Sequence, residues 1–508
     1  MEKIAIIDLG SNTARLVIVK VLEGGYFRVI DELKEPVRLA QDMEIDGFLR
    51  PIRIQQTIKT LKMFKTLYES HKVSKVFAYG TAAVRSAKNQ KAFVEDVYNY
   101  TGIKLQVLSE LEEATLVYTG VINSMDVPKG LIVDIGGGST KIIYYNRRVL
   151  INEHTLPFGA VTLTDKFQQE QCSPEERSAK IVAYVKERIQ AELPWIKEIE
   201  PDVQLIAVGG SMRNLGRISR RLKRYPLDMA HNYHIDVAEF KTIFDTIRTL
   251  EIEKTAKIKG LSSARADIFP SALAIMDAML SETTFSEIII GGAGMREGAM
   301  FRYAVPSTHE KPISDVLGHS IYTMLNYFDC KIPHAEHVFN LSLQLYRQLK
   351  VLHKLPRPYV KILRIASMLH DIGGSYRYYD HHKHSCYFIM NSNLYGVSQK
   401  EIIIAAIIAG MHEKNVFEVA QSEFAPYLTL LNEDEIDAIR KLAVIVRIAE
   451  CFDRSSGGNI TGIVCDVLGD SVIMKTETTG ADVTLEIKDA MSALQDFRKA
   501  FHKNLEIL

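Results

Sequence analysis

Two segments of the chain set an aspartate and a glycine turn between two apolar, strand-like runs. They are IAIIDLGSNTARLVIVKV near the N-terminus and LIVDIGGGSTKIIYYN beginning at Leu131. Because glycine lacks a Cβ, a turn such as 136–140 can take positive φ and direct several backbone N–H groups at one phosphate. Asp8 and Asp134 end the preceding strands and can hold a hydrated Mg²⁺ or Mn²⁺ against phosphate oxygens. One such segment could be an ordinary hairpin, but two matched copies predict two related halves that face each other.

Two more glycine segments follow strand-like runs, at 205–218 and 287–300. Each is either a plain strand-to-helix turn or a further loop that approaches phosphate. Arginines recur at helical spacing behind the first of these segments, so most of them lie on one face of the predicted helix. That face is either simply solvated or an electrostatic track for a long polyanion. The arginines are Arg213, Arg217, Arg220, Arg221 and Arg224.

The order of these motifs resembles the exopolyphosphatase and guanosine pentaphosphate phosphohydrolase family, a branch of the actin, sugar kinase and Hsp70 superfamily. The resemblance implies an α/β fold of two ribonuclease-H-like, actin-like ATPase subdomains that clamp phosphates between paired hairpins. The matching segments are DLGSNTARL (8–16), YGTAAVRSA (79–87), LSELEEATLVYTGV (108–121), VDIGGGST (133–140), AVGGSMR (207–213) and GMREG (294–298).

The resemblance also implies catalytic roles. It makes Glu113 the carboxylate that orients the attacking water, Arg85 a bidentate grip on phosphate, and Asp134 a catalytic as well as a metal-binding residue. Without the resemblance, Glu113 would belong to an acidic helix start and Arg85 would be a surface cap. The turns, the arginine run and the resemblance together give the residues that we expect to bind phosphate: Ser11, Asn12, Gly136, Gly137, Gly138, Ser139, Lys141, Gly210, Ser211, Met212, Arg213 and Arg217.

Lys141 departs from the family pattern, in which a glutamate that helps to hold the metal usually follows GGGST. An ammonium group cannot ligate Mg²⁺, and it would offer its positive charge to phosphate instead. The metal content and the catalytic competence of the cleft are therefore open. Glu112 or Asp134 could supply the missing negative charge.

A second set of residues with metal-binding chemistry occurs in the helical stretch 311–455. It contains MLHDIGG, with an upstream histidine and a downstream aspartate on other helices, and it resembles the HD phosphohydrolase superfamily. Such ligands suit Mn²⁺, Fe²⁺ or Co²⁺ ions that activate water. Alternatively, the histidines are remnants in a domain that prolongs a polyphosphate channel and mediates dimerisation. The expected ligands are His334, His370, Asp371 and Asp453, with His384 and His412 available for a second ion or a phosphate.

Four domains are predicted to carry these residues. Residues 1–125 and 126–305 alternate β-branched runs with helical patterns, as two actin-like α/β subdomains should. Residues 311–455 have apolar positions at three- and four-residue spacing and form an all-α, HD-like domain. Residues 456–508 form a small α+β appendage. Its strands are expected at 460–468, 471–478 and 481–487.

Composition limits the partners of the protein. The chain has 508 residues, and Lys+Arg and Asp+Glu both number 62, so no global charge attracts it to nucleic acid or to an anionic membrane. The five scattered cysteines form no CxxC pair and argue against a zinc ribbon or a disulfide framework. The N-terminus does not have the pattern of a signal peptide, and the apolar runs are too short to cross a bilayer. We therefore expect a cytoplasmic protein.

These features together predict a homodimeric exopolyphosphatase that releases orthophosphate from the end of inorganic polyphosphate. Hydrolysis of guanosine pentaphosphate at its 5′ end is the nearest alternative. In another alternative, the HD-like domain is the phosphohydrolase and the N-terminal clamp senses polyphosphate. The remaining alternative is a nucleotide-binding, actin-like kinase or scaffold.

Overall fold

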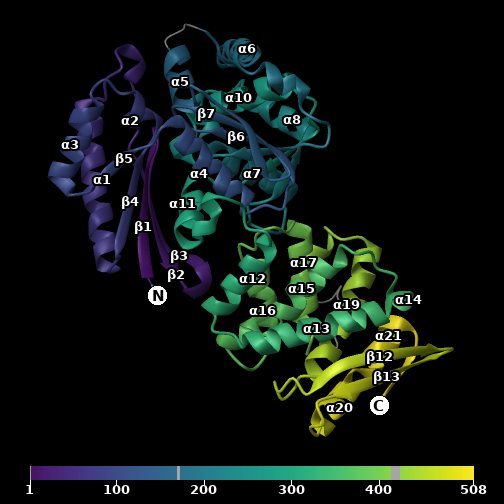
Figure 1. Ribbon diagram of the computed structural model, residues 1–508. Helices are drawn as coiled ribbons and strands as arrows, with labels where there is room; N and C mark the ends of the chain where they lie inside the picture. Colours follow the sequence, from purple (N-terminus) through teal and green to yellow (C-terminus); the bar gives the residue numbers. More distant parts are fainter. Residues whose placement is uncertain (1, 169–171, 414–423) are drawn as a thin grey trace. The chain divides into compact units, whose positions relative to one another are not determined.

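The computed structural model describes residues 2–168, 172–413 and 424–508. The chain forms two compact units, Met1–Val316 and Leu317–Leu508, drawn in Figure 1. The first unit contains two sheets and their helices, and the second contains a helical region and a small sheet. The α/β fold class is thus confirmed, while the division into four domains stays a prediction.

The first sheet has the strand order β3-β2-β1-β4-β5. Its first three strands form an antiparallel meander, and β4 and β5 run parallel to β1. The centre of β1 is buried on both faces, which explains its unbroken apolar run. The strands are β1 (Glu2–Leu9), β2 (Thr13–Val21), β3 (Phe27–Pro36), β4 (Lys75–Gly80) and β5 (Leu105–Val107).

The second sheet repeats this plan with one more strand, in the order β10-β11-β9-β6-β7-β8. Strands β6, β7 and β8 form the antiparallel meander, and β9 and β11 continue the sheet in parallel. The β6–β7 hairpin therefore corresponds to the β1–β2 hairpin, as the internal repeat predicts. The strands are β6 (Lys129–Ile135), β7 (Thr140–Asn146), β8 (Val149–Leu156), β9 (Gln204–Val208), β10 (Tyr233–Asp236) and β11 (Glu287–Ile290).

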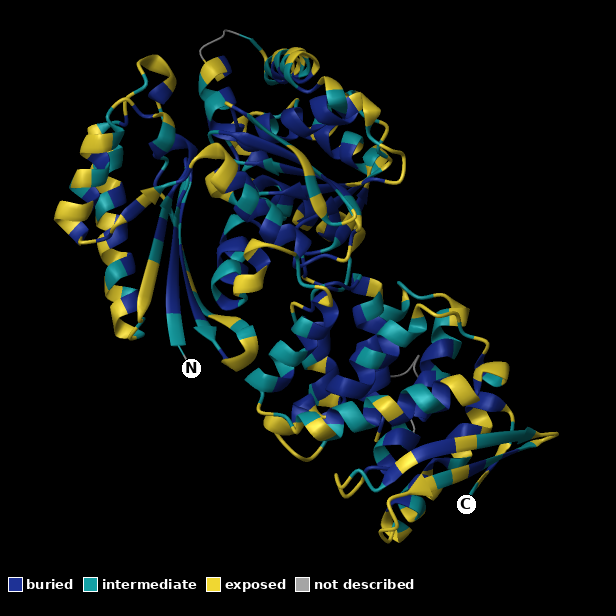
Figure 2. Ribbon diagram, in the orientation of Figure 1, coloured by how far each residue is buried: buried dark blue, intermediate teal, exposed yellow. Residues whose placement is uncertain are grey.

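Helices cover both sheets. Figure 1 shows α1 and α3 beside the first sheet, and their apolar side chains join its core. Figure 2 shows the strands mostly buried and the outer helix faces exposed. The helices of this unit are α1 (Pro51–Ser70), α2 (Ala82–Ser86), α3 (Gln90–Thr101), α4 (Glu110–Ile122), α5 (Ala160–Gln168), α6 (Pro174–Glu192), α7 (Gly210–Lys223), α8 (Val237–Ile247), α9 (Ile252–Thr255), α10 (Phe269–Ser281) and α11 (Met295–Ala304).

Helices α4 and α11 cross at two glycines. A Cβ on Gly120 of α4 would lie 2.1 Å from the carbonyl oxygen of Gly294, and one on Gly298 of α11 would lie 1.9 Å from that of Leu116. Only glycine allows the two backbones to approach so closely. Because α4 carries Glu113, this crossing determines where that carboxylate lies.

The second unit is helical except for a sheet of order β12-β13-β14. One expectation was wrong here: part of 481–487 belongs to helix α20, and the third strand comes from the C-terminus. The helices are α12 (Val316–Tyr327), which begins at the boundary, α13 (Ile332–Gln348), α14 (Lys350–His353), α15 (Tyr359–Leu369), α16 (His381–Met390), α17 (Gln399–Gly410), α18 (Ala425–Leu428), α19 (Glu433–Cys451), α20 (Thr484–Ala490) and α21 (Leu494–Phe501). The strands are β12 (Ile460–Leu468), β13 (Ser471–Thr478) and β14 (Asn504–Ile507).

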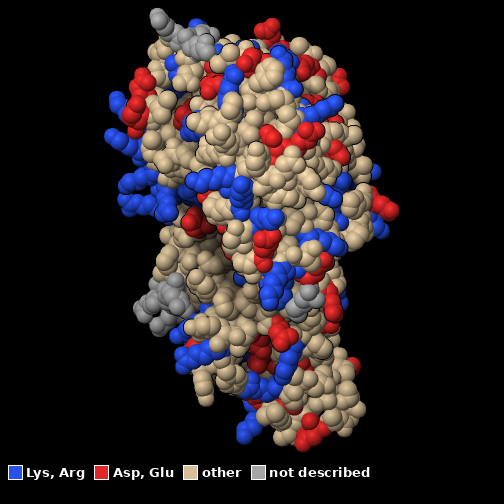
Figure 3. All heavy atoms as spheres, turned by 90° about the vertical axis from the view of Figure 1, so that its left-hand side faces the viewer, with Lys and Arg blue, Asp and Glu red and all other residues tan. Residues whose placement is uncertain are grey.

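Figure 3 shows one side of the molecule, on which basic and acidic side chains are interspersed. Within the described part of the chain, no helix has the length and apolarity needed to cross a membrane.

We expect Gly298→Ala to lower the free energy of unfolding of the N-terminal unit by about 3 kcal/mol, because the new methyl group clashes with a backbone oxygen and forces α4 and α11 apart. Urea denaturation measures this change. Gly374→Ala is the matched control, since a Cβ there meets nothing within 4 Å. Equal stability of the two variants would contradict the tight crossing.

Candidate active site

The two glycine hairpins touch. A Cβ on Gly138, in the β6–β7 turn, would lie 2.5 Å from the Oγ of Ser11 in the β1–β2 turn, and one on Gly137 would lie 3.0 Å from the Ser11 Cβ. None of residues 136–138 has a left-handed φ. Among the described glycines that line the adjoining cavity, Gly209, after β9, is the one with a left-handed φ, of 109°. Close approach, rather than positive φ, is therefore the reason for glycine in the second hairpin.

A cavity of about 140 Å³ adjoins these turns and is lined by residues of both sheets, α4, α7 and α11. The buried hydroxyl oxygen of Ser139 has no hydrogen-bond partner among the described residues, so it is available to a ligand. The sequence-predicted residues that line the cavity are Asp8, Ser11, Asn12, Glu113, Asp134, Gly136, Gly137, Gly138, Ser139, Lys141, Gly210 and Arg213.

Three predicted phosphate-binding residues are not among the residues that line this cavity. The Ser211 hydroxyl accepts a hydrogen bond from Arg265 at 3.4 Å. Met212 is fully buried in the hydrophobic core, and Arg217 is exposed on α7. Their roles in phosphate binding stay predictions.

The arginine run on α7 does not act as one group. Arg213 lines the cavity, whereas Arg217 and Arg221 are exposed on the helix. Arg220 is buried, and its guanidinium lies 3.2 Å from the carboxylate of Asp228, so it stabilises the fold locally.

Glu113 owes its position to the start of α4. Ser109 and Glu112 form a capping box, in which the Ser109 hydroxyl accepts from the Glu112 N–H at 3.2 Å and the Glu112 carboxylate accepts from the Ser109 N–H at 2.7 Å. Glu112 is therefore exposed and engaged at the cap, outside the cavity lining. The next residue, Glu113, is directed inward and is 4% exposed.

Two cationic side chains bind the Glu113 carboxylate. The Lys141 ammonium donates to one oxygen, and Arg85, on α2, donates to the other at 2.9 Å. Burial by itself would raise the pKa of Glu113, but Lys141 and Arg85 outweigh burial and hold the pKa below its ordinary value. Arg85 thus contacts the catalytic candidate directly, although it is not among the cavity-lining residues.

Each hairpin aspartate has a cationic neighbour. The Lys141 Nζ lies 4.0 Å from an Asp134 carboxylate oxygen, and the Arg296 Nε lies 4.0 Å from an Asp8 carboxylate oxygen. Burial raises the pKa of both aspartates, and the neighbouring cations oppose that rise. Lys141 therefore lies between Glu113 and Asp134.

Further cations, which the sequence analysis did not single out, gather at the same cleft. Burial and neighbouring arginines lower the pKa of Arg15 to about 10 and the pKa of Lys34 to about 8. Burial and Arg15 lower the pKa of Arg265 to about 10. Arg15 and Arg265 line the cavity. Crowded cations of this kind favour a multiply charged anion, because it reduces their mutual repulsion.

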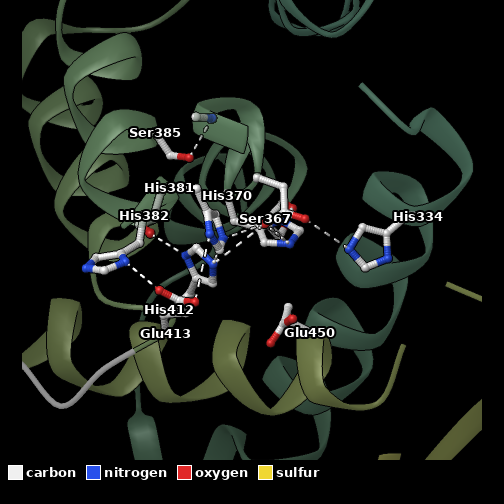
Figure 4. Close-up of polar contacts among 12 residues, drawn as sticks. His334, Ser367, His370, His381, His382, Ser385, His412, Glu413 and Glu450 are labelled. Atoms are coloured by element: carbon white, nitrogen blue, oxygen red, sulfur yellow. Dashed lines mark hydrogen bonds and ion pairs between the residues drawn. The ribbon is translucent and has the colours of Figure 1, made fainter. Parts of the chain in front are cut away.

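The helical unit gathers the second set of predicted residues. His334, His370 and Asp371 form one group of possible metal ligands, and Asp371, His381 and His412 form another. Figure 4 shows His370, His381 and His412 directed toward one another. Asp453 lies behind His334, with its carboxylate 2.7 Å from His334 Nδ1.

Helix α16 begins at the first histidine of the HHKHS segment, and this histidine points into the cluster. His381 takes part in the cluster, whereas His384 lies outside these groups and contacts the ring of Tyr376. The sequence analysis singled out His384 and not His381, since spacing alone does not tell which residue of a histidine-rich segment is directed inward.

We expect Lys141→Met to lower the free energy of unfolding at pH 7 by about 3 kcal/mol, because buried Glu113 loses one of its two cationic partners. Adding Glu113→Gln should restore most of this loss in a double-mutant cycle measured by urea denaturation. Since the pKa of Glu113 is below 4.5 in the folded state, the stabilisation is fully present above about pH 4.5 and declines as the pH falls through the folded pKa. This account of the ion pair would be wrong if the two substitutions lowered the free energy of unfolding additively. It would also be wrong if the loss caused by Lys141→Met stayed the same at acidic pH.

Comparisons with known proteins show to which family the chain belongs. Residues 17–305 match the Ppx/GppA phosphatase family, and residues 317–493 match Ppx/GppA phosphatase, domain III. The chain is 24% identical to the guanosine-5′-triphosphate,3′-diphosphate pyrophosphatase of Aeromonas hydrophila, over 89% of this chain and 88% of the relative. It is 27% identical to the protein of the same name from Pseudoalteromonas translucida, over 84% and 85%.

Solved structures show the same fold. An exopolyphosphatase from Cytophaga hutchinsonii superposes with a TM-score of 0.56 at 23% identity, over 60% of this chain and 98% of that chain. The Aquifex aeolicus member of the Ppx/GppA family superposes with a TM-score of 0.51 at 26% identity, over 61% and 99%. With the family match spanning most of the chain, the protein belongs to the Ppx/GppA phosphatase family and is a hydrolase of phosphoric anhydrides.

Proposed function

We propose that the cleft of the N-terminal unit removes the terminal orthophosphate from inorganic polyphosphate. The observation that supports this proposal best is the gathering of cationic side chains around the two touching hairpins, with the buried Glu113 carboxylate at the same cavity. A linear polyanion presents negative charge along its whole length, so it matches several cations at once.

The chemistry of the cavity wall favours polyphosphate over a nucleotide. No aromatic side chain is present among the described residues that line the cavity, so no ring is available there to stack on a purine. Its polar groups are arginines, Lys141, carboxylates, hydroxyls and glycine backbone. Apart from the carboxylates, these groups donate N–H and O–H hydrogen bonds to phosphoryl oxygens.

Glu113 would orient the attacking water and accept its proton. In the structure this carboxylate is occupied by Lys141 and Arg85. An incoming terminal phosphoryl group competes for both cations, because its oxygens are acceptors of the same kind. The cations would thus pass from Glu113 to the phosphoryl group, stabilise its charge, and leave Glu113 free to bind water.

A divalent cation, Mg²⁺ or Mn²⁺, fits the hairpin aspartates. Asp8 and Asp134 both line the cavity and supply the carboxylate oxygens that hard cations prefer. Glu113 is less suitable as a ligand, since both its oxygens already bind cationic side chains. An ion at the aspartates would neutralise phosphate oxygens, while the residues of the chain position the phosphoryl group and the water.

Guanosine pentaphosphate is the second candidate substrate. The observation that favours it is the similarity of the chain, over more than four fifths of its length, to two proteins named guanosine-5′-triphosphate,3′-diphosphate pyrophosphatase. The same phosphoryl site would serve either substrate. Competition experiments separate them: polyphosphate should inhibit hydrolysis of guanosine pentaphosphate far more strongly than the nucleotide inhibits hydrolysis of polyphosphate.

Glu113→Gln should lower kcat for phosphate release from long-chain polyphosphate by about 100-fold to 10,000-fold, because the amide cannot accept the proton of water. The measurement is orthophosphate release in the presence of Mg²⁺ or Mn²⁺. Glu110→Gln, on the exposed side of the same helix turn, should retain activity. Full activity of Glu113→Gln would show that this carboxylate does not take part.

Arg213→Gln should raise KM for polyphosphate about tenfold, because it removes a charge-assisted contact inside the cavity. Arg221→Gln removes an exposed arginine from the same helix and should leave KM within about twofold. If the two variants raise KM equally, the solvated arginines of α7, rather than the cavity, bind the chain.

A further inference from the structure

His231 lies in the segment between α7 and β10 and is 6% exposed. Both of its ring nitrogens have backbone partners in other parts of the N-terminal unit. Its Nε2 lies 3.1 Å from the carbonyl oxygen of Ser124, just after α4, and its Nδ1 lies 3.1 Å from the backbone nitrogen of Gly292. The ring therefore connects the end of α4 with the turn that follows β11.

These two partners determine the protonation state of the ring. The Ser124 oxygen can only accept a hydrogen bond and the Gly292 N–H can only donate one, so Nε2 carries the proton and Nδ1 keeps its lone pair. Burial lowers the pKa of His231 to about 4, which keeps the ring neutral near pH 7. A neutral imidazole thus satisfies two backbone groups at once, and an apolar side chain would leave both of them unpaired.

The turn 291–294, which His231 contacts, reaches the wall of the cavity at Gly294. A Cβ on Gly292 would lie 2.7 Å from the Cβ of His231, so the ring lies directly against the backbone of the turn. At its other end, the carbonyl oxygen of Gly294 is the atom that Gly120 of α4 approaches. The turn is therefore fixed to α4 at two points, directly at Gly294 and through His231 at Gly292.

Arg213 depends on the same turn. Its Nη1 donates to the carbonyl oxygen of Gly292 at 3.4 Å, and among the described residues this oxygen is the one hydrogen-bond acceptor of the guanidinium. Burial, and then Arg296 and Arg265, lower the pKa of Arg213, while Glu297 opposes them. Two neighbouring arginines thus repel this guanidinium, and its orientation in the cavity follows the position of the Gly292 carbonyl.

We propose that His231 is a positioning residue of the candidate active site. It holds the turn at Gly292 against the end of α4, and the Gly292 carbonyl in turn holds Arg213 in the orientation that binds a phosphoryl group. Since α4 carries Glu113, the same contact fixes the arginine relative to the carboxylate that orients water. The inference rests on the proposed function of this cleft, and His231 itself lies outside the cavity lining.

Loss of a positioning contact has a different kinetic effect from loss of stability. Arg213 binds phosphate in the ground state and in the transition state alike, so its displacement raises KM and leaves kcat nearly unchanged. A general loss of stability lowers the amount of folded enzyme, and with it the apparent kcat, without altering KM. The two kinetic constants therefore separate a positioning role of His231 from a merely structural one.

Two amide substitutions in the full-length protein separate the two hydrogen bonds of the ring. The Asn Oδ1 takes about the place of the imidazole Nδ1, so His231→Asn keeps an acceptor for the Gly292 N–H. The Gln Nε2 takes about the place of the imidazole Nε2, so His231→Gln keeps the donor to Ser124 and loses that acceptor. We expect His231→Gln to raise KM for polyphosphate about threefold to tenfold and His231→Asn to raise it less than about twofold, with kcat nearly unchanged in both.

A double-mutant cycle tests whether His231 acts through Arg213. Adding His231→Gln to Arg213→Gln should raise KM less than about twofold further, because the guanidinium that the turn orients is already absent. His234→Gln is the matched control, since it removes a half-exposed histidine of β10 that pairs with Glu287 at the surface. It should leave both kinetic constants within about twofold of the wild type. Urea denaturation verifies that each variant is folded.

Binding of tripolyphosphate gives a measurement that does not depend on turnover. Isothermal titration calorimetry in the presence of EDTA measures the affinity of the cleft for the anion. His231→Gln should raise the Kd about threefold to tenfold, and His231→Asn should raise it less than about twofold, as for KM.

The proposal is overturned if His231→Gln and His231→Asn have equal KM and Kd values, or if His231→Gln keeps its full effect on KM in the Arg213→Gln background. Either result leaves the proposed function of the cleft intact. A wild type that binds tripolyphosphate but releases no orthophosphate from polyphosphate would contradict the proposed function instead, and the Kd values of the variants would still decide the role of His231. A wild type that does not bind the anion would overturn both.

Discussion

The contact between the two hairpin turns constrains the whole N-terminal unit. Ser11 lies so close to Gly138 that no side chain fits between the two turns. The strands that enter these turns also carry Asp8 and Asp134, so the contact brings the two carboxylates to one cavity. The crossing of α4 and α11 is likewise a close contact between two backbones, and it places Glu113 at the same cavity. The candidate active site is thus assembled by backbone contacts that tolerate little displacement.

Charge distribution in the cleft follows from this close assembly. Glu113 and Lys141 are both almost fully buried, where an unpaired charge is costly, and each therefore requires the other. Arg85 supplies a second positive charge to the same carboxylate. Five cationic side chains and four carboxylates line the cavity, so its lining has a small excess of positive charge. Lys141 thus places a cationic side chain inside the cleft, beside Glu113 and Asp134.

The helical unit gathers a different set of polar side chains from those of the N-terminal cleft. It gathers histidines around one carboxylate, Asp371, and the Nε2 atoms of His381 and His412 lie 3.0 Å apart. The orientation of His370, His381 and His412 is set by a hydrogen bond from Nδ1 to a backbone carbonyl oxygen.

Local pattern was enough to predict much of this protein. Period-two and period-3.6 apolar spacing, with glycine turns, predicted both related α/β halves and the helical stretch that follows, because these features depend on near neighbours along the chain. The same reasoning misjudged 481–487, where alternating apolar residues belong partly to a helix and the third strand comes from the C-terminus.

The tertiary structure decided the rest. Arg265 has no motif around it and reaches the cleft only through the fold. His381 and His384 are almost adjacent in sequence, yet only His381 is directed into the cluster, because the start of α16 sets which side of the helix faces the other histidines. The sequence by itself determined the elements and the motifs they carry. Which side chains meet was determined by packing between segments far apart in the chain, and no local pattern encodes those contacts.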